Sequence, residues 1–206
     1  SNDLMVSSDE AEAIYLFQGN QSENDGFGDL IPLAVSEPVN DVLAIDADFD
    51  GDMDIVSASL WDDTIAWFEN DGASDPSWTE ATIATSADGP RGIHVADMDN
   101  DGDMDIVSAS IGDRTIAWYE NDGASDPSWT AADIDTDVGG AVAVFVADMD
   151  NDGDMDIVAA LAGSNTIAWY ANNAGIPEFS NIMMPIVSVL AIVGFNYRRR
   201  KINQDE

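Results

Sequence analysis

The sequence predicts an all-β protein made of β-propeller-type blades, each with four antiparallel strands. A nine-residue acidic string occurs three times, and each copy begins 51 residues after the one before it. Each 51-residue unit also holds four short apolar segments separated by turn-forming residues, which is typical of a propeller blade. The chain has room for about three to four blades, and closed propellers begin at about four. It is therefore either a fragment of a longer array or a set of units that stack in an open or oligomeric form.

The four strands of a unit follow one another in a fixed order. The first is a short apolar segment directly before the acidic string, and the second follows the string with large and small residues in alternation. The third carries a tryptophan at the same phase in every unit, which we interpret as core between blades rather than as a ligand-stacking residue. The fourth follows Glu-Asn-Asp-Gly-Ala-Ser-Asp-Pro-Ser-Trp, which two units share. In the first unit we expect these strands at 42–45, 54–60, 64–68 and 79–85, and the repeated tryptophans are Trp67, Trp118 and Trp169.

The two ends of the repeat array are incomplete. Residues 1–38 contain two apolar segments that resemble only the last two strands of a unit, and the final unit stops after its third strand at Asn172. A ring could close if these N-terminal strands completed the last blade. We divide the chain into an N-terminal partial blade at 1–38, the repeats at 39–176 and a C-terminal segment at 177–206.

The acidic string has the chemistry of a hard-cation site. Each copy places aspartate at positions 1, 3, 5, 7 and 9 and glycine at position 6. Carboxylates this close repel one another without a counter-ion, and an all-oxygen ligand set suits calcium better than magnesium. The chain has no cysteine and one histidine, which excludes zinc and copper from these loops. We predict about three Ca²⁺ sites, with the candidate ligands Asp46, Asp48, Asp50, Asp52, Asp54, Asp97, Asp99, Asp101, Asp103, Asp105, Asp148, Asp150, Asp152, Asp154 and Asp156.

These loops are not EF-hands, although an EF-hand also begins Asp-x-Asp-x-Asp-Gly. An EF-hand needs a bidentate glutamate at position 12 and a helix on each side. Position 12 is occupied here by Ser57, Ser108 and Ala159, and the residues that follow each string favour a strand. The alternative that the strings are ordinary solvated acidic runs does not account for three copies in one register.

Composition excludes several classes of function. The formal net charge is −35, and four of the six basic residues lie together at 198–201. Such an acidic surface repels nucleic acid, which is bound through lysine and arginine clusters. No nucleophile with a base, phosphate-binding loop or paired-glutamate constellation is present, and we expect no enzymatic activity. The one histidine, His94, lies in an apolar strand and is interpreted as packed or at an edge rather than catalytic.

The pattern Asp-x-Asp-x-Asp-Gly-Asp-x-Asp-Ile-Val, followed by strands, resembles the FG-GAP or VCBS repeats of integrin-like propellers over residues 39–172. The resemblance implies a calcium loop between the first two strands of each blade. Side chains at positions 1, 3, 5 and 9 would be ligands, together with the backbone carbonyl at position 7 of Asp52, Asp103 and Asp154. Such repeats serve adhesion and surface recognition, or accompany polysaccharide-acting enzymes. The fold alone does not choose among these roles.

The C-terminal segment has a separate pattern. Pro177, Glu178 and Phe179 precede an apolar run at 182–197, and four basic residues follow the run. Sixteen helical residues span about 24 Å, less than the roughly 30 Å of a hydrocarbon core. The order of motif, hydrophobic helix and basic cluster resembles the PEF-CTERM sorting signal of archaeal surface proteins, which an archaeosortase cleaves. The alternative is a plain C-terminal membrane anchor, and either interpretation places the repeats outside the cell.

The sequence therefore predicts a calcium-binding, non-catalytic repeat module displayed at the cell surface. Its expected partners are a surface protein or glycan, the sorting transpeptidase, and the membrane through 182–197 at least before processing. Two other functions stay open: an accessory propeller of a polysaccharide-acting extracellular enzyme, and a structural component of the cell envelope.

Overall fold

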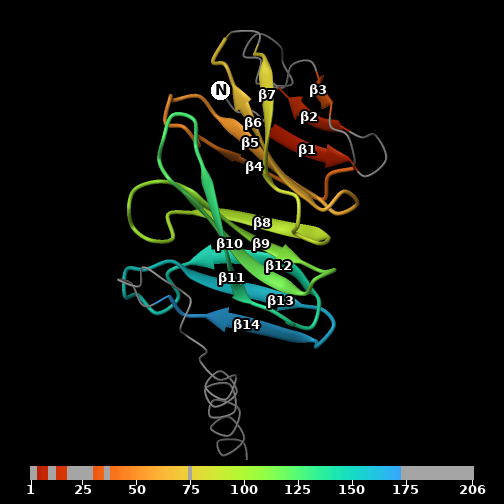
Figure 1. Cartoon of the computed structure of the whole chain (residues 1–206), viewed down its shortest axis with the longest axis vertical. Coiled ribbons are helices and arrows are strands. Elements are labelled where there is room, and N and C mark those ends of the chain that lie inside the picture. Colours follow the sequence, from red (N-terminus) through yellow and green to blue (C-terminus); the bar gives the residue numbers. More distant parts are fainter. Residues whose placement is uncertain (1–3, 9–12, 18–29, 35–37, 74–75, 173–206) are drawn as a thin grey trace, which may run out of the picture. The chain divides into compact units, whose positions relative to one another are not determined.

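The computed structural model describes residues 4–8, 13–17, 30–34, 38–73 and 76–172, and all of its regular elements there are β-strands (Figure 1). The strands form four separate antiparallel sheets that follow one another along the chain. The predicted all-β class, with four-stranded antiparallel sheets in repeats, is confirmed. The motif at 177–179 and the apolar run at 182–197 lie outside the described residues. Within the described residues, no helix has the length and hydropathy needed to cross a membrane.

Two sheets are complete blades of four strands in sequence order. The first complete blade consists of β4 (Asp41–Ile45), β5 (Asp54–Ser59), β6 (Thr64–Asn70) and β7 (Trp78–Ala84). The second consists of β8 (Pro90–Ala96), β9 (Asp105–Ser110), β10 (Thr115–Asn121) and β11 (Trp129–Asp135). Both have the strand order that the 51-residue repeat predicts.

The outer two sheets have three described strands each. The N-terminal sheet is formed by β1 (Leu4–Ser8), β2 (Ala13–Phe17) and β3 (Leu30–Ala34). The third blade is formed by β12 (Ala141–Ala147), β13 (Asp156–Leu161) and β14 (Thr166–Tyr170). The N-terminal strands thus pair with one another, and β14 pairs with β13 alone among the described strands.

Neighbouring sheets pack face to face, which explains why the second strand of a complete blade is buried along its whole length. One core lies between the first and second blades, where Ile65 and Trp67 share a cluster with Ile106 and Tyr119. Because Trp67 is only 3% exposed in this cluster, the expected inter-blade role of the repeated tryptophan is confirmed in the first blade.

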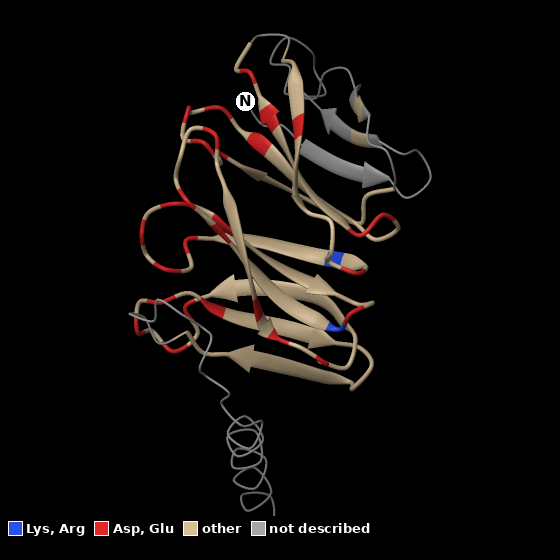
Figure 2. Cartoon of the chain, viewed as in Figure 1, with Lys and Arg blue, Asp and Glu red and all other residues tan. Residues whose placement is uncertain are grey.

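The first strands of successive blades approach one another closely. The Ile93 N–H in β8 donates to Asp41 Oδ2 of β4 at 2.9 Å. A Cβ atom on Gly92 would lie 3.0 Å from the Cα of Ala143, so a side chain there would require β12 to shift by a few tenths of an ångström. Each acidic string connects the first strand of a blade to its second, and acidic residues are concentrated in such connections (Figure 2).

Candidate metal centres in three acidic loops

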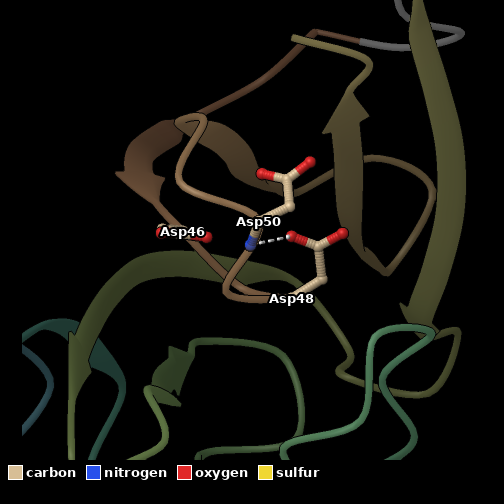
Figure 3. Close-up of side chains that lie close together, drawn as sticks. All are labelled: Asp46, Asp48 and Asp50. Carbon is tan, nitrogen blue, oxygen red and sulfur yellow. Dashed lines mark hydrogen bonds between the residues drawn. The ribbon is translucent and has the colours of Figure 1, made fainter.

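Each acidic string folds into a loop in which three carboxylates converge. In every loop, one oxygen from each of three aspartates lies within 4.8 Å of the others. Figure 3 shows the group in the first loop. The groups are Asp46, Asp48 and Asp50; Asp97, Asp99 and Asp101; and Asp148, Asp150 and Asp156. The side chains at positions 1 and 3 of the string are therefore gathered in all three loops.

The loop backbone produces this convergence. The residue at position 4 has a positive φ in each loop, and the glycine at position 6 has φ near 95–102°, a conformation that side-chain-bearing residues rarely adopt. The amide at position 5 donates to the carboxylate at position 3, and the amide at position 7 donates to the carboxylate at position 5; in the first loop these bonds are 3.2 and 2.9 Å. Such turns hold the carboxylates on the inner side of the loop.

The aspartate at position 1 differs between loops in its hydrogen bonds. Asp97 accepts from the amides of Asp101 and Gly102, each at 3.1 Å. Asp148 accepts in the same way from Asn151 and Gly153. In the first loop, Asp46 Oδ1 is buried and has no hydrogen-bond partner among the described residues. A buried carboxylate oxygen without a donor needs a partner, and a calcium ion is a suitable one, so the residues present fit this cation.

The aspartate at position 9 anchors the loop to the blade. Asp54, Asp105 and Asp156 are at most 1% exposed. In each, Oδ2 accepts from the amide at position 2 and Oδ1 accepts from the amide of the asparagine at the end of the third strand, or just beyond it in the third blade. The Trp67 indole also donates to Asp54 Oδ2 at 2.9 Å. Of the three, only Asp156 belongs to a converging group, so the predicted position-9 ligand is gathered with other carboxylates in the third loop alone.

The side chains at position 7 stand outside the converging groups. The carboxylates of Asp52 and Asp103 occupy the space that a Cβ atom would fill on Gly72 and Gly123. Asp154 is buried and accepts from the Asn100 side-chain amide at 2.9 Å, which joins the second loop to the third. This placement is compatible with the expectation that position 7 offers its backbone carbonyl rather than its carboxylate.

Crowding and burial make several loop carboxylates poor acids. Burial raises the pKa of Asp105 to about 7, although bonds from Asn121, Met98 and Trp118 oppose the shift. Burial also raises the pKa of Asp54. The pKa of Asp99 is raised first by burial and then by the neighbouring charge of Asp101. A bound cation favours the ionised carboxylate and would reverse these shifts.

Asparagines link neighbouring loops, a feature that the sequence analysis missed. The Asn121 side-chain amide, at the end of β10, donates to the backbone carbonyl of Ala47 in the first loop at 3.0 Å. Asn172 donates to the carbonyl of Met98 in the second loop at 2.8 Å. The available signal was the recurrence of asparagine at 70, 121 and 172, at the same interval as the acidic strings.

Fold and loops together define the class of protein: a repeat protein with propeller-type blades, each with an acidic loop between its first and second strands. The family model for the FG-GAP-like repeat matches residues 46–108 and 99–159, which together cover more than half of the chain. The chain belongs to the FG-GAP-like repeat family. No curated protein matches it.

One solved structure supports the same fold. An Agrocybe aegerita lectin of propeller type, described for its specific recognition of non-reducing terminal N-acetylglucosamine, is similar with a TM-score of 0.52 and 20% sequence identity, over 84% of this chain and 50% of the lectin chain. A protein from Lactobacillus plantarum is similar with a TM-score of 0.44 and 14% identity, over 85% of this chain and 53% of that chain. The chain spans about half the length of each.

Proposed function

We propose that this protein is a calcium-binding repeat module that recognises a protein or glycan at the cell surface and has no catalytic activity. The observation that carries the calcium assignment is the buried Asp46 Oδ1, which no described residue hydrogen-bonds, beside the converging carboxylates of Asp48 and Asp50. Equivalent carboxylate groups in the other two loops support about three sites.

The residues that would hold the ion are the aspartates at positions 1, 3 and 5, or 1, 3 and 9 in the third loop, with the carbonyl at position 7. Calcium accepts about six to eight oxygen ligands in flexible geometry, whereas magnesium demands a near-ideal octahedron. The ion supplies positive charge where the loop concentrates negative charge. The chain's own contribution is the positive-φ backbone and the turn hydrogen bonds that hold these oxygens together.

Calcium titration by isothermal calorimetry tests the metal assignment, with circular dichroism recorded before and after chelation. We expect about three sites and a gain of β-sheet signal or thermal stability on calcium addition. Magnesium at the same concentration is the control ion, and it should bind more weakly. A melting temperature that neither calcium nor chelator changes would contradict the proposal.

Recognition is proposed from the repeat family and from the propeller fold that the chain shares with a lectin. The loop carboxylates are held by backbone amides, which suits cation binding better than proton transfer. A glycan array that includes terminal N-acetylglucosamine, probed with and without calcium, tests the glycan form of this proposal. No binding to any glycan on the array, together with calcium-dependent ordered assembly, would instead favour a structural component of the cell envelope.

Surface display is proposed from the C-terminal order of motif, apolar run and basic cluster. The processing partner would be an archaeosortase that acts near Pro177–Phe179. Mass spectrometry of the protein isolated from its native envelope tests this: a C-terminus close to 177–179 supports processing, and an intact C-terminus supports the plain membrane anchor.

A further inference from the structure

One face of the third blade is uncovered although its residues match buried residues of the other blades. We name it the open face, and it is formed by Met149, Val158, Ala160, Ile167 and Trp169. Ile167 is 74% exposed, while the equivalent Ile65 and Ile116 are both 0% exposed. Met149 is 50% exposed, while the equivalent Ala47 and Met98 are 0% and 1% exposed. The same positions are thus core in two blades and surface in the third.

In the other sheets, this face is always covered by the sheet that comes next in the chain. Ile14 of the N-terminal sheet, which stands where Ile65 stands in the first blade, is 0% exposed and packs with Ala66 and Phe68 of the first blade. Ile65 in turn packs in a cluster with Ala117 and Tyr119 of the second blade. The open face is therefore the next copy of an interface that the molecule already uses, and the occupant that fits it is another blade of the same kind.

A second copy of the chain can supply such a blade. The N-terminal sheet turns its Ile14 face toward the first blade, and among the described residues no sheet precedes it on the opposite side. The chain also covers 50% of the propeller-type lectin chain with 84% of its own length, so the matched part of two copies has about the length of that chain.

We infer that the open face binds the N-terminal sheet of a second copy, so that two copies close one ring through two identical contacts. Each contact is head-to-tail, and such contacts end in a closed ring when the rotation between copies closes. The open face consists of uncharged residues, so burying it removes apolar surface from water without burying a carboxylate. The inference concerns the packing of blades and does not depend on which cation the loops hold.

Sedimentation velocity of the full chain at millimolar calcium, over a range of protein concentrations, tests this inference. We expect a dimer that stops at two copies. Ile167→Asp places a charge in both contacts and should raise the dimer dissociation constant at least a hundredfold, because each contact loses a buried isoleucine. The matched control is Trp61→Asp, which changes a 70% exposed residue in the turn between β5 and β6, outside the open face, and should leave the dimer unchanged.

Three results would overturn the inference: a monomeric chain at all concentrations, a dimer that Ile167→Asp leaves intact, or oligomers that keep growing with concentration. The first would mean that the face is covered within one chain or by a different partner, and the third that the stack is open. Because Ile167 is exposed in the single copy, Ile167→Asp should retain the far-ultraviolet dichroism of the parent. Ile167→Ser provides a milder variant, with a smaller rise in the dissociation constant in the same direction.

Discussion

The second and third blades have nearly the same sequence but different environments. β9 and β13 both begin Asp-Ile-Val, and β10 and β14 both begin Thr-Ile-Ala-Trp-Tyr. β10 is buried except at Glu120, whereas the equivalent β14 has no fully buried residue. Burial of a blade is therefore a property of the next blade in the array rather than of its own sequence, as expected for repeat proteins whose units contact only their neighbours.

The acidic loops of the first and third blades also differ. In the first blade, which the second blade covers, the Trp67 indole donates to Asp54. In the third blade, the equivalent Trp169 indole nitrogen is buried but makes no hydrogen bond with the described residues, and Asp156 joins the converging carboxylates of its loop. Asp156 accepts the same two backbone hydrogen bonds as Asp54, so the two blades differ in the tryptophan bond and in whether the position-9 aspartate joins the converging group. The following predictions test how far the loops and the cores depend on their neighbours.

The largest expected effect is that of calcium. At free calcium about 100 times the dissociation constant, one site adds about 2.7 kcal/mol to the free energy of unfolding, and three independent sites add about 8 kcal/mol. That is comparable to the stability of a whole domain. Chelation should lower the melting temperature sharply or unfold the protein, as measured by calorimetry and circular dichroism.

Loop variants extend this prediction to the comparison of blades. Asp97→Asn with Asp99→Asn should cost more stability in calcium than Asp148→Asn with Asp150→Asn, although each pair removes two carboxylates of a converging group. The reason is that the second loop is hydrogen-bonded to the third blade twice, through Met98 and Asn100. Equal losses would show that the loops fold independently of their neighbours.

The next effect is that of truncating the equivalent isoleucines. Ile116→Ala should lower the free energy of unfolding by about 2 to 5 kcal/mol, because it leaves a cavity in a packed core. Ile167→Ala should cost less than about 1 kcal/mol in the dissociated chain, because its side chain is 74% exposed. Chemical denaturation of both variants at low protein concentration measures the difference. Similar losses would contradict the view that the third blade lacks a covering neighbour.

The pH dependence of the stability of the calcium-free protein reports on the buried Asp105 in the second loop. Asp105 has a folded pKa of about 7 against the ordinary 3.8, so the unfolded chain releases this proton at lower pH than the folded chain. The contribution of Asp105 to the free energy of unfolding is close to zero below about pH 3.8. It becomes destabilising as pH rises toward 7. Between pH 5 and 8 the free energy of unfolding of the calcium-free protein should fall by about 2 kcal/mol, after allowance for solvent screening.

Calcium should weaken or reverse this dependence, because a bound cation stabilises the ionised carboxylate. Denaturation at several pH values, with chelator and then with calcium, measures both slopes. In chelator, Asp105→Asn should flatten the slope of the free energy of unfolding against pH. It should also lower stability at every pH, because the new amide group would face the backbone donors that Asp105 accepts from. A slope that is the same with and without calcium would contradict a metal site in this loop.

The sequence analysis predicted the features that all repeats share. It could not predict the features that depend on a neighbouring blade. The 51-residue interval, the glycine at position 6 and the alternation after each string identified the blades, the loops and the gathered aspartates at positions 1 and 3. The same data could not show that Ile167 is exposed while Ile116 is buried, because both lie in the same local sequence. Nor could they show that Asp54 and Asp105 are held by backbone amides outside the converging groups, because strand ends bring those amides in from residues 16 positions away.

The smallest effect that we argue is that of the asparagine link between blades. Asn121 is fully buried, and its side chain bonds Ala47 of the neighbouring blade as well as Met104 and Gly123 of its own. Asn70, at the equivalent position, bonds only Met53 and Gly72 of its own blade among the described residues.

Asn121→Ala should therefore lower the free energy of unfolding by about 2 kcal/mol, and Asn70→Ala by about 1 kcal/mol or less, since a buried carbonyl left without a donor adds to the loss. Because the Ala47 carbonyl lies in the first loop, Asn121→Ala should also weaken calcium binding there, a change that Asn70→Ala lacks. Calorimetric titration of both variants separates a link between blades from a bond that merely supports its own loop.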